Sequence, residues 1–188
     1  MLRRAILAAT SLVIAGGISA CGLTGGERPA PESSPEPQGG GDPALAVEQP
    51  KTVAAVTDAC RLLTPEQLST LGAENNGEAD TTTFGEPKCD WSTDAFAFSV
   101  GLYVKTGGGA EQIYRSADNH DNFAPTRIGE YPAARVNAQS STCSVEVGIS
   151  DSESVTIDYT KYSGGTPEMA DPCGYAEKIA TEALNGIP

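Results

Sequence analysis

The sequence predicts an α+β fold in which an antiparallel sheet packs with an N-terminal and a C-terminal helix and is stapled by two disulfides. Three observations predict it. Helix-start signals lie around residue 64, segments between residues 89 and 159 alternate apolar and polar residues as strands do, and the chain ends in a segment with apolar residues at helical spacing. Together these elements form a sandwich of sheet and helices.

A lipoprotein signal peptide is predicted over residues 1–20. Two arginines precede the uncharged stretch 5–18, which is shorter than the ~20 residues of a membrane-spanning helix. The segment Ile18-Ser19-Ala20-Cys21 resembles the lipobox of bacterial lipoproteins. The resemblance implies that the cysteine sulfur is lipidated, that the signal is cut before it, and that acyl chains such as palmitate anchor the mature protein. Plain secretion and an uncut anchor helix are the alternatives.

Residues 21–53 are predicted to be the lipidated cysteine and a disordered tether, because proline and glycine are frequent there and aromatic residues are absent. Such a tether would lift the following domain off the membrane. All aromatic residues of the chain lie at or after Phe84. A single disulfide-stapled globular domain is therefore expected over residues 54–188.

The first predicted helix begins after Thr64. The segment Thr64-Pro65-Glu66-Gln67 is a capping box with proline at the first helical position. In such a box the threonine hydroxyl accepts from the Gln67 N–H, and the glutamine side chain accepts from the Thr64 N–H. Leu63 and Leu68 are spaced as a hydrophobic staple, and Gly72 is the expected stop.

Strands are predicted wherever the apolar residues recur with a period of two. A short strand carries Cys89 and Trp91 on one face, and residues 96–104 follow it. Residues 128–136 form a weaker strand, whose Pro132 predicts an edge position. Residues 145–149 and 155–159 flank a polar turn and are predicted to form a hairpin.

Two further helices are predicted. Residues 110–117 form a short one after a glycine run. The last begins at Asp171-Pro172, or one turn earlier at Thr166-Pro167, and ends at Asn185-Gly186. Its apolar face is formed by residues at helical spacing: Ala176, Ile179, Ala180, Ala183 and Leu184.

The four cysteines beyond Cys21 are predicted to form disulfides, because an even number in an exported domain is typical of them. Cys143 is in phase with the inward-facing residues of its strand, and Cys173 lies near the apolar face of the last helix. Cys60 precedes the first helix, and Cys89 shares a face with a tryptophan. This phase argument favours Cys60–Cys89 and Cys143–Cys173 among the three possible pairings.

Five segments resemble one known family. They are Asp58–Leu68, Cys89-Asp90-Trp91, Gly129–Ala133, Cys143–Val147 and Asp171-Pro172-Cys173. Together they resemble an actinobacterial lipoprotein family, the domain-of-unknown-function family 3558, from about residue 55 to the end of the chain. The family usually has proline where Ala59 stands. The resemblance implies an envelope lipoprotein of a Gram-positive actinobacterium, and it implies no activity.

Charge excludes several classes of partner and site. The chain has 12 Lys+Arg against 25 Asp+Glu, a formal net charge of -13. This balance repels nucleic acid and anionic lipid head groups, so no nucleic-acid partner is expected.

The single histidine rules out histidine-rich metal sites, and neither a metal nor a cofactor is predicted. No stretch after residue 20 is apolar enough to be a second membrane segment.

Candidate catalytic residues are few. His120, the one possible base of a hydrolase triad, lies in the polar loop Asp118–Asn122, and no Gly-x-Ser-x-Gly elbow is present. We expect a solvated loop histidine whose removal leaves folding and function intact. The same loop lacks the glycine and distal glutamate of an EF-hand, and Gly107–Gly109 lacks the Lys-Ser/Thr of a phosphate loop. No spacing singles out a pair of carboxylates.

Trp91 and the stripe of Phe96 and Phe98 are expected to pack in the core rather than to line a ligand pocket. The sequence therefore predicts a non-enzymatic binding module, lipid-anchored through Cys21 at the extracytoplasmic face of the cell membrane. Its partner would be an unknown envelope protein or a small ligand. A small extracytoplasmic hydrolase with an unrecognised site is the alternative.

Overall fold

The structure is a computed structural model and describes residues 42–188. The predicted signal peptide, Cys21 and most of the predicted tether lie outside the described residues. Over residues 42–188 the α-helices and strands are α1 (Pro65–Thr70), β1 (Glu78–Thr81), β2 (Pro87–Ser92), β3 (Phe96–Tyr103), α2 (Gly109–Arg115), β4 (Phe123–Ile128), β5 (Tyr131–Val136), β6 (Thr142–Gly148), β7 (Ser154–Lys161) and α3 (Pro172–Gly186). Short 3-10 helices are η1 (Pro43–Leu45), η2 (Ala59–Leu62), η3 (Ala117–Asn119) and η4 (Pro167–Ala170).

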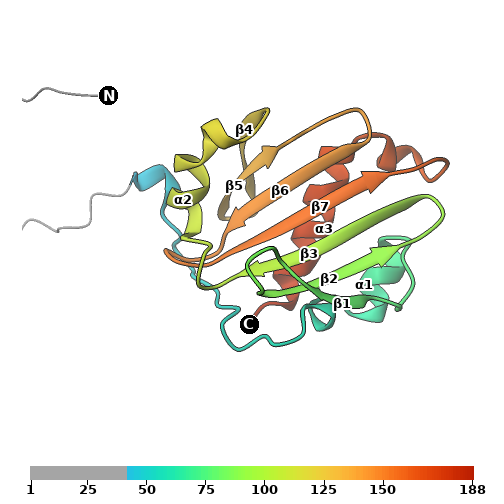
Figure 1. Cartoon of the computed structure of the whole chain (residues 1–188), viewed down its shortest axis with the longest axis horizontal. Helices are drawn as coiled ribbons and strands as arrows, with labels where there is room; N and C mark the ends of the chain where they lie inside the picture. Colours follow the sequence, from blue (N-terminus) through green and yellow to red (C-terminus); the bar gives the residue numbers. More distant parts are fainter. Residues whose placement is uncertain (1–41) are drawn as a thin grey trace, which may run out of the picture. The chain divides into compact units, whose positions relative to one another are not determined.

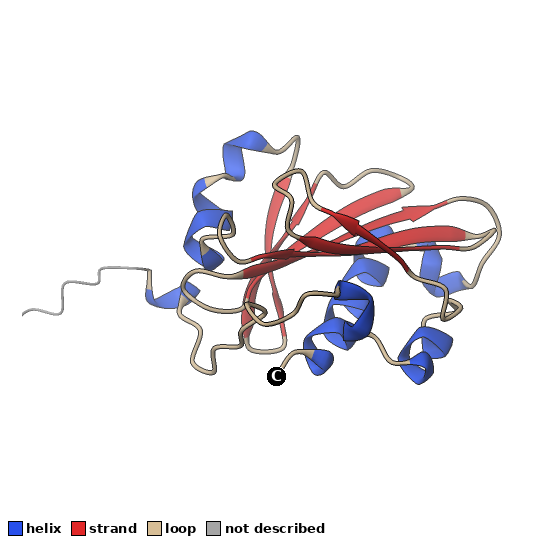
Figure 2. Cartoon of the chain, turned by 60° about the horizontal axis from the view of Figure 1, so that its bottom comes forward, coloured by secondary structure: helices blue, strands red, loops and turns tan. Residues whose placement is uncertain are grey.

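The strands form one antiparallel sheet of seven in the order β1-β2-β3-β7-β6-β5-β4 (Figure 1). The long helix α3 lies behind the sheet in that view and packs mainly on β6 and β7. Figure 2, in which the sheet is close to edge-on, shows most helical segments below it and a separate helical segment at its left-hand end. The predicted α+β fold is confirmed.

The core lies between the sheet and the helices behind it. The strand side chains that alternate inward are buried, as the period of two predicts. Trp91 is 2% exposed and stacks on Phe98 at 4.9 Å between ring centroids, and Phe96 lies beside them. These aromatic residues fill the core, as expected, because each lies on the strand face that α3 covers.

The termini of α1 and the start of α3 are those that the sequence predicts, whereas the helix predicted over 110–117 is α2, Gly109–Arg115, followed by η3. The Gln67 N–H donates to Thr64 Oγ1 at 3.3 Å, and the Thr64 N–H donates to Gln67 Oε1 at 2.9 Å. Gly72 has a φ of +64° directly after the helix, a conformation that favours glycine. Asp171 caps α3 by accepting from the Gly174 N–H at 3.1 Å.

Both predicted disulfides are confirmed. Cys60 in η2 is bonded to Cys89 in β2, and Cys143 in β6 is bonded to Cys173 in α3. They close loops with sequence separations of 29 and 30 residues. Loops of that length correspond to about 3–4 kcal/mol each in the chain-entropy account of disulfide stabilisation. The first bond joins the N-terminal helical segment to the sheet, and the second joins α3 to it.

Residues 128–136 differ from the prediction. They belong to a hairpin of β4 and β5, which turns at Gly129 with a φ of +59°. The edge strand is β4, and β5 pairs on both sides. Pro132 is tolerated there because the β5–β6 ladder begins one residue later, at Ala133. Strand β1 was not predicted, since its four residues are all exposed and carry no apolar alternation.

The folded unit also begins before residue 54, where the tether was expected to end. Val53 is fully buried, and its N–H donates to the Glu153 carboxylate at 2.6 Å. The Lys51 N–H donates to the Ile149 carbonyl at 2.9 Å, and the Lys51 ammonium donates to the Ile187 carbonyl. Residues 43–53, here called the strap, therefore belong to the domain. Within residues 42–188 no helix is long and apolar enough to cross a membrane.

Candidate functional site

The sheet face turned away from α3, here called the outer face, carries mostly polar side chains. Residues paired across neighbouring strands form rows on it. One row runs from Ser144 on β6 through Asp158 on β7 and Ser99 on β3 to Asp90 on β2. The next contains Glu146, Thr156, Gly101 and Lys88 in the same strand order. In Figure 1 this face is toward the viewer, and α2 is the helix at its left side.

Helix α2 is held against the outer face by a close backbone approach. A Cβ on Gly148 of β6 would lie 2.4 Å from the Ala110 backbone nitrogen, so only glycine fits there. A small apolar cluster completes the contact, with Ile113 of α2 on Ala134 and Val136 of β5. The chain then passes through η3 to His120, which this docking brings back over β6.

A groove of about 410 Å³ lies between α2 and the open part of the outer face. We call it the outer-face groove. Its floor is formed by side chains of β3, β6 and β7, and its walls by α2 with the residues after it and by the β1–β2 and β3–α2 connections. The lining residues are Phe84, Tyr103, Thr106, Gly107, Gln112, Ile113, Ser116, Asn119, His120, Asn137, Ser144, Glu146, Ser154, Thr156 and Asp158.

His120 is not the solvated loop residue that the sequence led us to expect. Its side chain is 14% exposed, and its Nε2 lies 3.8 Å from Oε1 of Glu146. The polar residues on either side of it in the chain suggested a loop in water, whereas the docking of α2 turns the imidazole into the groove. The expectation that its removal leaves function intact therefore loses its basis.

Glu146 is the least compensated carboxylate of the groove. Its side chain is 21% exposed, and it accepts no hydrogen bond from another residue within 42–188. Burial raises the pKa of its carboxyl; nearby His120 acts in the opposite direction, and Asp158 adds to the increase. Perturbed groups that converge in a concave site are a signature of function.

Asp158 and Tyr103 complete the floor. The Asp158 carboxylate accepts from the Ser144 hydroxyl at 2.6 Å and from the Ser99 hydroxyl at 3.3 Å. Burial raises the pKa of the Tyr103 phenol, and the charges of Asp158, Glu146 and Glu86 add to the effect. The floor is therefore a region of negative potential around an aromatic ring.

A buried carboxylate fixes the loop wall. Glu86 accepts from the Val104 and Lys105 N–H groups at 2.9 and 2.7 Å, and from the Thr106 hydroxyl. Burial alone would raise the pKa of Glu86, but these hydrogen bonds hold it below its usual value. At the rim, Phe84 is 65% exposed and meets the Tyr103 ring edge to face, with 6.2 Å between centroids.

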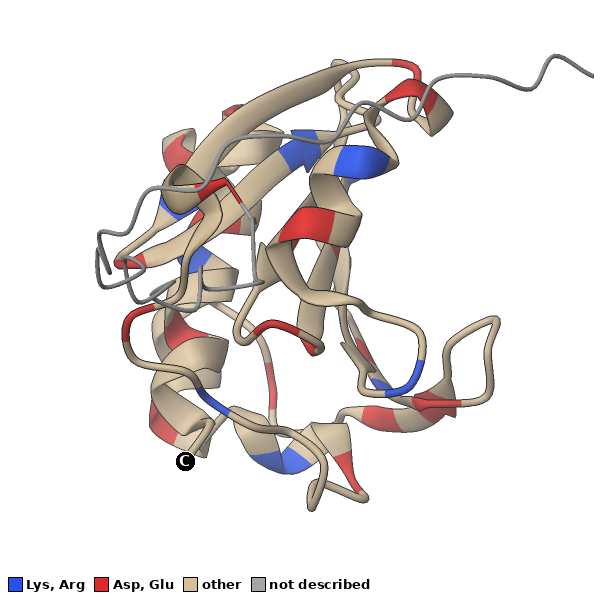
Figure 3. Cartoon of the chain, turned by 90° about the vertical axis from the view of Figure 1, so that its left-hand side faces the viewer, with Lys and Arg blue, Asp and Glu red and all other residues tan. Residues whose placement is uncertain are grey.

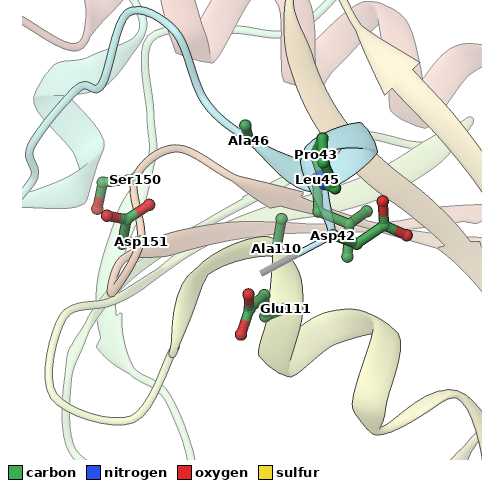
Figure 4. Close-up of a pocket in the computed structure, with 8 residues that line it drawn as sticks. All are labelled: Asp42, Pro43, Leu45, Ala46, Ala110, Glu111, Ser150 and Asp151. Carbon is green, nitrogen blue, oxygen red and sulfur yellow. The ribbon is translucent and has the colours of Figure 1, made fainter. Parts of the chain in front are cut away.

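A second hollow, of about 480 Å³, lies between η1, the start of α2 and the β6–β7 turn. Figure 4 shows the carboxylates of Asp42, Glu111 and Asp151 at separate positions around it. Among residues 42–188 there is no group of three or more side chains placed to hold a metal ion. This hollow is the larger of the two, but the pKa-shifted Glu146 and Tyr103 and the exposed Phe84 lie at the outer-face groove. We therefore take that groove as the candidate site.

The groove holds part of an acid–base arrangement. An imidazole beside a carboxylate is the base and its orienting partner in a hydrolase triad. Two serine hydroxyls of the groove are engaged elsewhere. Ser116 donates to the Gln112 and Ile113 carbonyls, and Ser144 donates to Asp158. No hydroxyl among residues 42–188 donates to His120.

Sequence reasoning missed Glu146 and Asp158 as site residues. A signal was present, since both are out of phase with the buried residues of β6 and β7 and so had to face outward. The approach of His120 had no such signal, because it depends on the docking of α2. Cys21, the predicted lipid-attachment residue, lies outside the described residues. The glycine run 107–109 leads into α2, with Gly108 at the N-cap and Gly109 as the first helical residue, and both have positive φ.

Comparison with known proteins gives one match. A protein-family model described as "Protein of unknown function (DUF3558)" matches residues 16–185. No curated protein and no solved structure matches the chain.

Proposed function

The chain belongs to the DUF3558 family, and we propose that it is a lipid-anchored protein of the cell envelope whose domain acts as a non-enzymatic binding module through the outer-face groove. The anchor rests on the sequence, in which Ile18-Ser19-Ala20-Cys21 follows a short uncharged apolar stretch. The proposed location is the extracytoplasmic face of the membrane of an actinobacterium. Two disulfides within one small domain support an oxidising compartment.

One observation carries the binding role. The outer-face groove brings a half-buried carboxylate, an imidazole and two aromatic rings from four separate parts of the chain into one concavity. Holding Glu146 charged and without a hydrogen-bond donor costs stability, so the core does not explain its position. Residues that lower stability without serving the core are typical of binding sites.

A small hydrolase is the second candidate, and the pairing of His120 with Glu146 is what favours it. The hydroxyls named above are bonded away from the imidazole, which favours the binding role. The test is whether wild-type protein hydrolyses ester, amide or glycoside probes. Hydrolysis that is lost in His120→Gln would favour the hydrolase over the binding module.

The anchor is tested with Cys21→Ser. We expect wild-type protein to partition into detergent with a lipid mass on its N-terminal peptide, and the variant to lack that mass. If the variant is processed and partitions as the wild type does, the lipoprotein proposal is overturned.

The binding role is tested by filling the groove. Thr156 lines it, and Thr160 lies on the same face of the same strand outside it. Full-length protein is extracted from its own membranes in a non-ionic detergent, and bound molecules are measured by native mass spectrometry. We expect Thr156→Trp to lose a bound species that wild type and Thr160→Trp retain. The same bound species in both variants would overturn the groove as the binding site.

A further inference from the structure

The charges around the outer-face groove indicate what class of ligand it takes, an inference that rests on the function proposed above. Glu146 and Asp158 lie on the floor, and none of the lining residues is lysine or arginine. Lys88 stands at the far end of the row that contains Glu146, where Asp80 and Asp90 already hold it at 3.2 and 3.1 Å. The chain as a whole has 25 Asp+Glu against 12 Lys+Arg, and Figure 3 marks both kinds along the ribbon. Charge complementarity therefore favours a cation.

Glu146 supplies the specific counter-charge. Its neighbours in the groove are His120, at 3.8 Å, and Asp158, which repels it. Its charged form is poorly stabilised in the free protein, because burial raises the pKa of its carboxyl and Asp158 acts in the same direction. A ligand cation would offset this charge, whereas an anionic ligand would add a third negative group.

Two aromatic rings add a surface for the rest of the ligand. Tyr103 lies on the floor, and Phe84 stands at the rim with 65% of its surface exposed. Aromatic faces attract ammonium groups within ~6 Å of the ring centroid, and they also bury alkyl groups. A ligand that combines a cation with an apolar part would therefore use both kinds of lining group.

The size of the groove favours a small molecule. A volume of about 410 Å³ holds about fourteen water-sized units of about 30 Å³ each. We propose that the outer-face groove binds a small organic ammonium ion, with the Glu146 carboxylate as its counter-ion and the Tyr103 and Phe84 rings against its apolar part.

The test uses three probes with the same ring and chain but different charge: 4-phenylbutylamine, 4-phenylbutanol and 4-phenylbutanoate. Each is titrated into full-length protein in a non-ionic detergent, and backbone amide NMR signals are followed. We expect the amine to shift the amides of Tyr103, Glu146 and Thr156 and to bind at least about tenfold more tightly than the alcohol, with the carboxylate weakest. Lowering the pH should weaken amine binding, because protonation of Glu146, whose pKa burial raises, removes the counter-charge of the ligand cation.

Two variants separate the roles of charge and ring. Glu146→Gln should reduce the preference for amine over alcohol to less than about threefold, whereas Tyr103→Leu should weaken the amine and the alcohol alike, because the Tyr103 ring contacts the apolar part that both probes share. Glu168→Gln, at an exposed carboxylate in η4, is the control. It should change neither the preference for the amine nor the affinity for either probe.

The proposal is overturned if the alcohol or the carboxylate binds within about threefold of the amine, or if no probe shifts the groove amides. Such a result would leave the groove as a binding site as long as Thr156→Trp still loses its bound species and Thr160→Trp does not. Equal behaviour of those two tryptophan variants would instead contradict the proposed function itself.

Discussion

His120 Nε2 lies 3.8 Å from Glu146 Oε1, in a groove that the two residues reach from opposite sides, one from the segment after α2 and the other from β6. The contact is longer than a hydrogen bond and leaves the carboxylate poorly compensated. This incomplete pairing distinguishes Glu146 from Asp158, which two hydroxyls satisfy.

Glu146→Gln should make the protein more stable at neutral pH. Burial raises the pKa of the carboxyl in the folded state, so the folded protein binds the proton more tightly than the unfolded chain does. The wild type therefore loses stability as the pH rises from the unfolded pKa of about 4.5 through the folded pKa. The melting temperatures of wild type and variant, compared from pH 4 to pH 8, should converge at the acid end. A variant that is less stable at pH 8 would contradict the prediction.

Removing the imidazole should move the titration of Glu146. Burial is the main cause of the raised pKa, and His120 partly offsets it. His120→Ala should therefore raise the pKa of Glu146 further, as measured from its side-chain carboxyl signal by ¹³C NMR. Asp118→Asn, at an exposed neighbour in the loop, serves as the control. An unchanged Glu146 titration in His120→Ala would show that the two groups do not interact.

Glu153→Ala should release the strap. Its carboxylate accepts from the Val53 N–H at 2.6 Å and from the Thr52 hydroxyl at 2.9 Å, and the glutamate is itself buried. Leaving a buried N–H without an acceptor costs about 1–3 kcal/mol. Denaturant unfolding should show that loss, and the Val53 amide should exchange faster with solvent. Asp151→Ala, in the same turn but exposed, should neither destabilise the protein nor speed exchange of the Val53 amide. Equal effects of the two substitutions would show that Glu153 does not hold the strap.

The ion pair of Arg135 with Glu177 should stabilise the domain only above acid pH. Arg135 Nε lies 2.6 Å from Glu177 Oε1, and Thr126 donates to the same oxygen. The hydrogen bond from Arg135 is the main cause of the lowered pKa of Glu177. Its contribution is therefore present above the unfolded value of about 4.5 and is lost as the pH falls through the folded pKa.

Because the Arg135 side chain is 39% exposed, Glu177→Gln should cost no more than about 1 kcal/mol at pH 7. Unfolding curves at pH 7 and at pH 3 measure the difference, which should shrink at the lower pH. A loss of the same size at both values would mean that the pair does not act through charge.

Local sequence patterns predicted the structural features that depend only on neighbouring residues. The capping box at Thr64, the inward phase of Phe98 and the placement of Cys173 near a helical apolar face depend only on nearby residues and on periodicity. The β4–β5 hairpin was missed because Gly129 gave its only turn signal, and the exposed strand β1 has no apolar alternation to reveal it.

The candidate site was predicted less well, because it depends on contacts between distant segments. His120 reaches the groove only because Gly148 lets α2 lie directly on β6. The strap joins the domain only because Glu153, in a turn far along the chain, accepts from Val53. Neither contact has a signature in the neighbouring sequence. The polar or proline-rich composition of the two segments therefore led to the prediction that both are exposed to solvent.

The central claim, that the outer-face groove contacts the protein's ligand in the cell, is tested most directly by photo-crosslinking. Within residues 42–188 two large apolar side chains are exposed, Phe84 at the groove and Tyr162 away from it. Benzoylphenylalanine is placed at each position in full-length protein in intact cells, and mass spectrometry measures the adducts after irradiation. We predict a discrete adduct at position 84 that Glu146→Gln abolishes, and none at position 162. An adduct at 162 alone, or one at 84 that persists unchanged in Glu146→Gln, would contradict the claim.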